Sequence, residues 1–146
     1  MPKSTDACNR FLNLLYRAVA WATVADNAAS TPLTNVCVAL HTATLTPATN
    51  SQAENEVAYT NYTRKDVARG AGWTAAASGS LSNAALLPFP QSGATGATLA
   101  AVSTGTTISG ATPVWHYGAL NSPITIGAAA NITPQFLANA LVITES

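Results

Sequence analysis

The sequence is poor in charged side chains, and those that it has are unevenly distributed. Only 8% of the 146 residues are Asp, Glu, Lys or Arg, and the formal net charge is zero. An average soluble domain carries roughly 25% of such residues. The stretch from Gly70 to Thr144 contains none of the four. Since nucleic-acid binders take much of their affinity from a surplus of Lys and Arg facing phosphates, we expect this chain not to bind nucleic acid.

Long apolar runs are also missing. No run approaches the roughly 20 residues that span a bilayer, and a neutral chain gains little from charged lipid headgroups. The N-terminal sequence MPKSTDACNR is polar and lacks the apolar core of a signal peptide. We therefore expect that the protein is synthesised in the cytoplasm and does not associate with a membrane. Cys8 and Cys37 are expected to be reduced packing residues rather than a disulfide.

Residues that carry chemistry are scarce as well. His41 and His116 are the only histidines, and neither stands in a metal-ligand spacing. The sequence has no phosphate-binding loop, no GxGxxG and no GxSxG around a nucleophilic serine. A glycosidase needs two carboxyl groups facing each other across a cleft, and the charge-free half supplies none. The sequence thus predicts a protein that is not an enzyme, with no catalytic residue, cofactor or metal site.

The charges that are present lie mainly in the N-terminal segment and between Glu54 and Arg69. In the second group the acids are expected to pair with the bases. A surface of Thr, Ser and Asn without charge suits a protein covered by its own copies or by partners, since free monomers usually intersperse charge. We therefore predict a homo-oligomer, a dimer or trimer; the alternative is a neutral, Thr-rich domain. The candidate interface residues are Lys3, Arg10, Arg17, Glu54, Glu56, Arg64, Lys65, Asp66 and Arg69.

The first segment is predicted to be a helix. Ser4, Thr5 or Asp6 can cap it, and Arg10 to Val24 contains neither Gly nor Pro. Its apolar residues recur at helical spacing and predict a buried stripe of Phe11, Leu14, Leu15, Ala18, Trp21, Ala22 and Ala25.

After Pro32 the apolar period changes to two, which is typical of strands. Strands are expected at 35–42, 59–68, around Trp73, and at 84–89, 97–102, 114–120, 124–126 and 141–144, with turns at 78–80 and 82–83. Short strands with polar turns after one helix predict a mainly β fold, an antiparallel β-sandwich or a jelly-roll-like barrel. We expect a single domain over 1–146, with an arm and helix at 1–30 and the β part at 33–146.

Four strings, in order, resemble motifs of small virion proteins of tailed bacteriophages. They are NEVAYTNYTR at 55–64 with VAR at 67–69 and GWT at 72–74, SNAALLPFP at 82–90, YGAL at 117–120, and ITPQF at 132–136 followed by ALVIT at 140–144. The resemblance runs from about Val36 to the end. It implies a virion component without enzymatic activity, labelled in such proteins as head decoration (cement) or as tail and fibre. It also implies that the aromatic residues fill the core and that Gly118 and Pro134 set turns.

The leading hypothesis is a capsid decoration protein that binds and stabilises the phage head, with the major capsid protein or other virion proteins as partners. Many weak contacts repeated over a lattice can add up to strong binding. The alternative is a tail, collar or fibre subunit, although the chain has no long repetitive shaft. A further alternative is a carbohydrate-binding module, for which Tyr59, Tyr62 and Trp73 are the candidate aromatic platform. In each case the protein is located in the virion.

Overall fold

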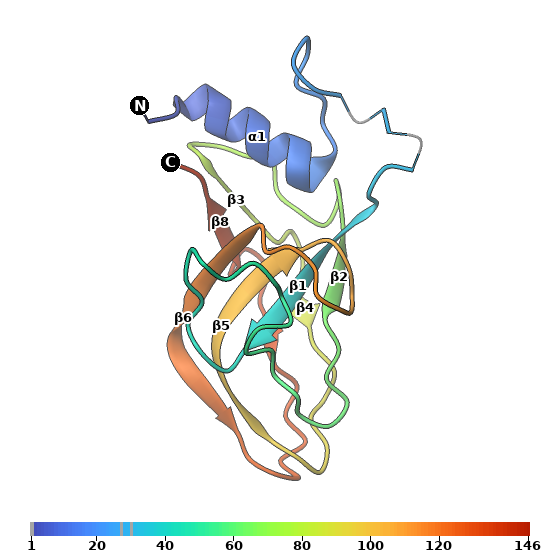
Figure 1. Ribbon diagram of the computed structural model, residues 1–146, viewed down its shortest axis with the longest axis vertical. Helices are drawn as coiled ribbons and strands as arrows, with labels where there is room; N and C mark the ends of the chain where they lie inside the picture. Colours follow the sequence, from blue (N-terminus) through green and yellow to red (C-terminus); the bar gives the residue numbers. More distant parts are fainter. Residues whose placement is uncertain (1, 27, 30) are drawn as a thin grey trace. The chain divides into compact units, whose positions relative to one another are not determined.

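The computed structural model describes residues 2–26, 28–29 and 31–146. The chain is a mainly β protein with antiparallel strands and one N-terminal helix (Figure 1), as the sequence predicts. The elements in chain order are α1 (Thr5–Arg17), β1 (Asn35–His41), β2 (Lys65–Ala68), β3 (Ser80–Ser82), β4 (Leu87–Pro88), β5 (Ala97–Gly105), β6 (His116–Ile126), β7 (Gln135–Phe136) and β8 (Val142–Thr144).

Two compact units make up the chain, and each collects distant segments. The first contains Met1–Asn35, Val67–Leu87 and Phe136–Ser146, and the second contains Val36–Asp66 and Pro88–Gln135. The single domain expected from the sequence stays a prediction. Residues 1, 27 and 30 of the predicted N-terminal arm lie outside the described residues.

Helix α1 begins where the sequence predicts. The Ser4 hydroxyl accepts a hydrogen bond from the backbone N–H of Ala7 at 3.2 Å, which satisfies one of the free donors of the first turn. The buried face consists of Cys8, Leu12 and Tyr16. These three residues are spaced four apart and therefore lie on one face of the helix. None of them belongs to the predicted stripe, so the buried face of α1 is next to the predicted one.

The predicted extension of the helix to Val24 is wrong. Ala18 adopts a left-handed conformation with φ of 54°, and the N–H of Val19 bonds the carbonyl of Asn13 at 3.1 Å. The N–H of Ala18 also donates to the carbonyl of Asn13, and this six-to-one hydrogen bond closes the helix as a glycine cap usually does. The chain then makes a tight turn in which Trp21 and Ala25 exchange backbone hydrogen bonds of 2.8 and 2.9 Å.

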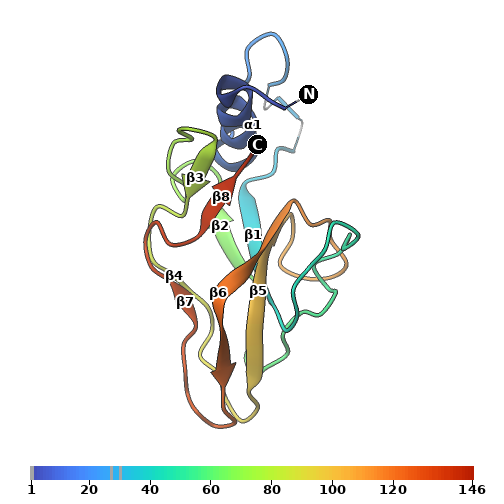
Figure 2. The ribbon, with the colours of Figure 1, turned by 90° about the vertical axis from the view of Figure 1, so that its left-hand side faces the viewer.

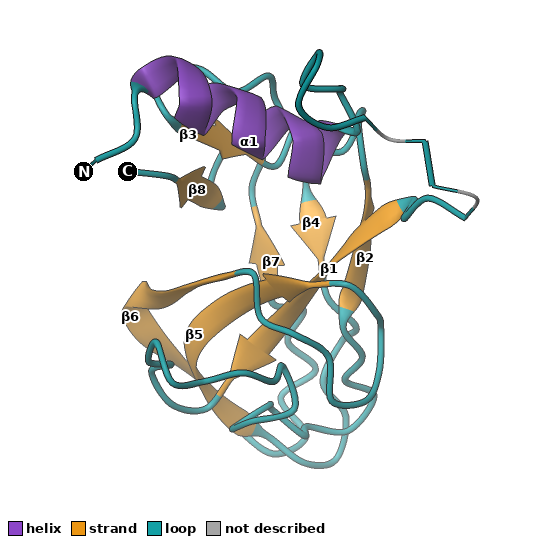
Figure 3. Ribbon diagram, turned by 45° about the horizontal axis from the view of Figure 1, so that its top comes forward, coloured by secondary structure: helices purple, strands orange, loops and turns teal. Residues whose placement is uncertain are grey.

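In the first unit α1 lies beside the two-stranded sheet of β3 and β8 (Figure 3). The two strands pair antiparallel, with Leu81 opposite Ile143, and both of these side chains are buried. Tyr16 of α1 packs edge-to-face on Trp73, with ring centroids 4.8 Å apart. The sequence predicts a turn at 78–80 and 82–83. In the structure residues 80–82 form the strand β3, because Ser80 and Ser82 pair with Thr144 and Val142 of β8.

The larger sheet has the strand order β2-β1-β5-β6. β5 pairs antiparallel with both β1 and β6, so that Leu40 faces Val102 and Val102 faces Gly118. Figure 2 shows β5 and β6 running together along their length. β1 is buried from Val36 to His41 on both of its faces, as suits an inner strand. Over the described part of the chain the sheets stay open, with β6 at an edge, and do not close into a barrel.

β6 joins two predicted strands into one element. Leu99 faces Ile124 while Ala101 faces Ala119, so four residues of β6 stand opposite Ala100 alone. This irregularity contains Pro123, which has no N–H to give to a ladder. Gly118 lies within β6 and sets no turn, contrary to the implication of the resemblance. Both cysteines are buried and free, as predicted.

Candidate functional site

A chain of buried hydrogen bonds in the second unit begins at His41, the last residue of β1. Its Nδ1 lies 2.9 Å from the carbonyl oxygen of Glu54, so Nδ1 carries the proton and donates it. Its Nε2 lies 2.8 Å from Ser103 Oγ and accepts the hydroxyl proton. Burial lowers the pKa of His41, which keeps the imidazole neutral at neutral pH.

Gln52 extends this chain of hydrogen bonds from Ser103 in β5 to Thr112 in the loop between β5 and β6. Its Nε2 donates to Ser103 Oγ at 3.1 Å, and its Oε1 accepts from the hydroxyl of Thr112 at 3.0 Å. The backbone N–H of Gln52 also donates to the carbonyl of Thr112 at 2.9 Å. Gln52 is fully buried, so these bonds form away from water and fix the two loops to the sheet.

Arg64 is the next member, and its guanidinium uses all five of its N–H donors. Nε and Nη2 bind the two carboxylate oxygens of Glu56 at 2.7 and 2.8 Å. The remaining donors reach Thr107 O, Gly110 O and Thr112 Oγ1 at 2.8 to 3.1 Å. The hydrogen bond to Glu56 raises the pKa of Arg64, so the charge stays in place. One buried cation thus fixes the loop after β5.

Tyr62 connects this ion pair back to β1. Its hydroxyl donates to Glu56 Oε1 at 3.2 Å and accepts from the N–H of Leu40 at 2.9 Å. Its ring stacks on Phe89 and meets Tyr59 edge-on, at centroid distances of 6.4 and 5.3 Å. Burial raises the pKa of Tyr62, and raises that of Tyr59 to about 12. These rings fill the core of the second unit.

The aromatic platform considered for sugar binding is therefore packed inside the protein. Tyr59 is 2% exposed in the second unit, and Trp73 is 2% exposed in the first. A sugar ring stacks on the open face of an aromatic side chain, and neither of these faces is open. The packing role implied by the resemblance is the one that the structure shows.

The Ser103–His41 pair has the form of a nucleophile and its base, which in hydrolases lie within hydrogen-bond reach. Here both side chains are at most 1% exposed, so a substrate cannot reach the hydroxyl. The group that orients His41 is the carbonyl of Glu54 rather than a carboxylate. The pair serves to join β1 to β5.

The predicted interface residues of the second unit fall into two kinds. Glu56 and Arg64 form the buried pair, and this confirms one of the expected salt bridges. Glu54 is exposed and its carboxylate accepts hydrogen bonds from the N–H groups of Asn50 and Ser51. Asp66 is exposed and Lys65 half-buried on β2. A role of these residues at an interface stays a prediction.

In the first unit Lys3 and Glu145 form an ion pair, which raises the pKa of Lys3. Arg10 pairs with Asp6 one turn earlier in α1 at 2.8 Å, and both side chains are exposed. Arg17 is the last residue of α1, where a positive charge is favourable at the negative end of the helix dipole. These three basic residues stay candidates for an interface.

Arg69 has an internal role that the sequence does not reveal. Its guanidinium donates to the carbonyls of Leu14 and Leu15 in the last turn of α1, and to Leu33 O at 2.7 Å. The neighbouring Gly70 N–H donates to the carbonyl of Tyr16 at 2.9 Å. The last carbonyls of a helix have no partner within the helix, so Arg69 and Gly70 satisfy them. Burial lowers the pKa of Arg69.

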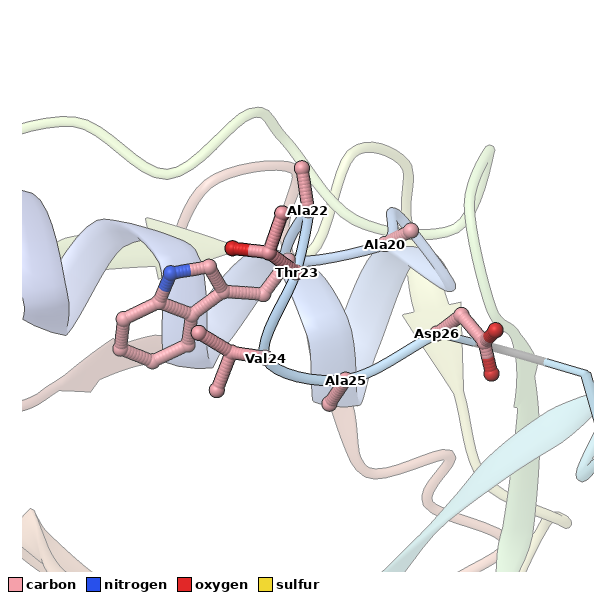
Figure 4. A pocket seen from close by; sticks show the side chains of 7 residues that line it. Ala20, Ala22, Thr23, Val24, Ala25 and Asp26 are labelled. Carbon is pink, nitrogen blue, oxygen red and sulfur yellow. The ribbon is translucent and has the colours of Figure 1, made fainter.

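A small hollow lies in the loop after α1 and is lined by the seven consecutive residues 20–26 (Figure 4). In Figure 4 the hydroxyl of Thr23, in the middle of the loop, and the carboxylate of Asp26, at its end, lie apart and point in different directions. The Asp26 carboxylate accepts a hydrogen bond from the N–H of Ala28. Because its polar groups do not converge, the hollow lacks the arrangement that orients a small ligand.

Two further observations concern the described residues as a whole. No three His, Cys, Asp or Glu side chains among them come together in a group that would hold a metal ion. None of the described helical segments is long and apolar enough to cross a lipid bilayer.

Comparison with models of known protein families identifies a phage family. The family model described as "Podophage GP4 fiber I protein gp80" matches residues 3–144 of this chain. The match extends over α1 and over the strands β1 to β8 of the described residues. It confirms the resemblance to structural proteins of tailed-phage virions. No curated protein matches the sequence significantly.

Proposed function

Because this chain belongs to the podophage GP4 fiber I protein gp80 family, we propose that it is a non-enzymatic structural subunit of a fibre on the phage particle. The observation that carries the proposal is the extent of the family match, residues 3–144. The proposal takes up the tail or fibre alternative in place of the head decoration role that the sequence favoured. The family description gives no support to a position on the head.

The second unit has the properties that a structural subunit needs. The buried polar side chains named above have hydrogen-bond partners within the unit: Arg64 gives five hydrogen bonds, and His41 and Gln52 are fully buried. Such a satisfied network favours one rigid arrangement of the loops. A rigid subunit holds its place in an assembly at lower entropic cost than a flexible one.

The surface supports assembly with other chains. From Gly70 to Thr144 the chain offers no charged group to water, and several large apolar side chains are exposed there, among them Leu86, Leu137 and Val142. Exposed apolar groups near one another are typical of surfaces that bind other proteins. We propose a homo-oligomer within the virion.

The proposal is tested by separating purified particles into heads and tails and probing both fractions with an antibody to this chain. The fibre proposal predicts the chain in the tail fraction, together with other tail proteins. Recovery with the heads, in amounts comparable to the major capsid protein, would restore the decoration hypothesis.

A further inference from the structure

A loop of the second unit is bound to the end of β1. It comprises residues 42–55, and His41, the strand residue before it, is fully buried. The loop closes at its base, where the N–H of Thr42 donates to the carbonyl of Asn55 at 2.7 Å. Above this base, hydrogen bonds to His41 and from Gln52 hold the loop to β1 and β5. We call residues 42–55 the His41 loop.

Both ring nitrogens of His41 take part in holding the loop, and each has a fixed role. Nδ1 donates to the carbonyl of Glu54 at 2.9 Å, and Nε2 accepts the hydroxyl proton of Ser103 at 2.8 Å. The oxygen of that hydroxyl accepts in turn from Nε2 of Gln52 at 3.1 Å. Only the neutral ring fits this pattern, because an imidazolium has two donors and no acceptor.

A proton on Nε2 of His41 breaks this arrangement. Ser103 Oγ would then face the N–H groups of His41 and Gln52 together, and its own proton would lose the nitrogen that accepts it. Ser103 is 1% exposed, so water does not reach the hydroxyl. A buried donor without a partner and a buried cation are both costly. The protonated ring therefore favours a state in which the loop has moved away and water reaches the ring.

The charged groups around the ring do not remove this cost. Burial, the largest effect, lowers the pKa of His41; the carbonyl of Glu54 and the carboxylate of Glu56 raise it, and the cation of Arg64 lowers it. Two hydrogen bonds from Arg64 already engage the carboxylate of Glu56. The carboxylate of Glu54 accepts from backbone N–H groups within the loop. β5, which contacts the ring through Ser103, contains no charged residue.

We propose that His41 is a pH switch for this loop: when its ring takes up a proton from solvent, the His41 loop separates from β1 and β5 while these strands stay paired. The strands have their own support, because Cys37 to His41 pair with Ala101 to Gly105 along the ladder. The switch belongs to the fold of the chain and does not depend on its place in the particle.

The size of the effect follows from the linkage between proton binding and opening. With the loop open, the imidazole titrates with its ordinary pKa of 6.5, whereas with the loop closed it stays neutral below that pH. The closed state therefore loses stability as the pH falls below 6.5. One pH unit lower, the ratio of open to closed loop rises by up to about tenfold over its value at neutral pH.

The test is amide hydrogen exchange of the full-length chain, followed by NMR at about pH 7.5 and about pH 5.5 and corrected for the intrinsic exchange rates. The reporting amide is that of Gln52, which donates to the carbonyl of Thr112 at 2.9 Å. On acidification its opening should increase about five- to tenfold in the wild type and by less than about twofold in His41→Gln. The amides of β1 should stay more protected than that of Gln52 at both pH values.

The matched control amide is that of Ala77 in the first unit, which donates to the carbonyl of Ser80 at 2.9 Å. Its opening does not uncover His41, so acidification should leave it unchanged in both proteins. A second measurement on the wild type is a pH titration of the ring nitrogens of His41. We expect the proton on Nδ1 at neutral pH, and protonation of Nε2 over the same pH range in which the Gln52 amide loses protection.

Four results would overturn the proposal. The first is a Gln52 amide that opens equally at both pH values in the wild type. The second is an equal increase in His41→Gln, which would assign the pH dependence to another group such as Glu56. The third is equal exchange of the Gln52 and β1 amides, which would mean that the unit unfolds as a whole. The fourth, which needs no variant to fold, is a His41 ring that becomes protonated without any loss of protection at Gln52.

Discussion

The guanidinium of Arg64 binds both carboxylate oxygens of Glu56, with Nε at 2.7 Å and Nη2 at 2.8 Å, and the Arg64 side chain is only 1% exposed. The two residues stand eight apart in the NEVAYTNYTR string. The same guanidinium reaches the carbonyls of Thr107 and Gly110. The string that supports the resemblance to phage proteins thus encodes the contact that holds the loop after β5.

The first prediction concerns this pair. Arg64→Lys keeps the charge but cannot reach five partners, because an ammonium lacks the planar fork of a guanidinium. The carbonyls of Thr107 and Gly110 then lose their donors, and buried acceptors without a partner are destabilising, so the free energy of unfolding should fall by about 3 kcal/mol in denaturant titrations. The control is Arg10→Lys in the exposed pair with Asp6, where a change within about 0.5 kcal/mol is expected. Equal losses in the two variants would contradict the role given to Arg64.

A second prediction follows from the lowered pKa of His41. Below the ordinary pKa of 6.5 the unfolded chain binds a proton that the folded imidazole does not take up. The stability present above that pH is therefore lost as the pH falls toward the folded pKa. Denaturant titrations at about pH 7.5 and about pH 5.5 should show the loss in the wild type and a smaller loss in His41→Gln. Identical pH profiles for His41→Gln and the wild type would refute the buried neutral imidazole.

Two glycines on paired strands give a third prediction. A Cβ added to Gly105 would lie 2.3 Å from Gln52 Oε1 and 2.6 Å from the carbonyl of Pro113, whereas one added to Gly118 meets no atom within 4 Å. Gly105→Ala must displace Gln52 and should cost about 1 to 3 kcal/mol of unfolding free energy. Gly118→Ala should be neutral or slightly stabilising. The comparison is made by thermal melting, and a Gly105→Ala variant as stable as Gly118→Ala would show that Gln52 is not fixed.

Arg69 gives the fourth prediction. Arg69→Lys removes donors from the last carbonyls of α1 and should lower the unfolding free energy by about 2 kcal/mol. Amides of Leu12 to Arg17 should exchange with solvent faster, since the end of α1 loses its partners. Hydrogen-exchange mass spectrometry of the N-terminal peptide measures this. Exchange at the wild-type rate would mean that the helix end does not depend on Arg69.

Elements with a clear local signal could be predicted from the sequence. The alternation of Val36, Val38 and Leu40 locates β1, and Ser4 marks the start of α1. The end of α1 could not be predicted, because Ala18 takes a left-handed conformation for which glycine is the usual signal. The strand β3 was missed since Ser80 and Ser82 are turn-prone residues that pair with β8, more than fifty positions away.

The buried hydrogen-bond network could not be predicted either, because its partners are also distant in sequence. The partners of His41 and Arg64 are set by the fold: Ser103 lies 62 positions from His41, and Thr112 lies 48 from Arg64. Charge pattern alone predicted the pairing of Glu56 with a nearby base. It gave no sign that Arg64 would also bind the backbone carbonyls of Thr107 and Gly110.

The central claim is that this chain is part of a fibre. It is tested most directly by electron microscopy of intact particles labelled with gold-conjugated antibody fragments against the chain. The account predicts gold on the fibres and none on the capsid surface. Gold spread over the head, with bare fibres, would contradict it.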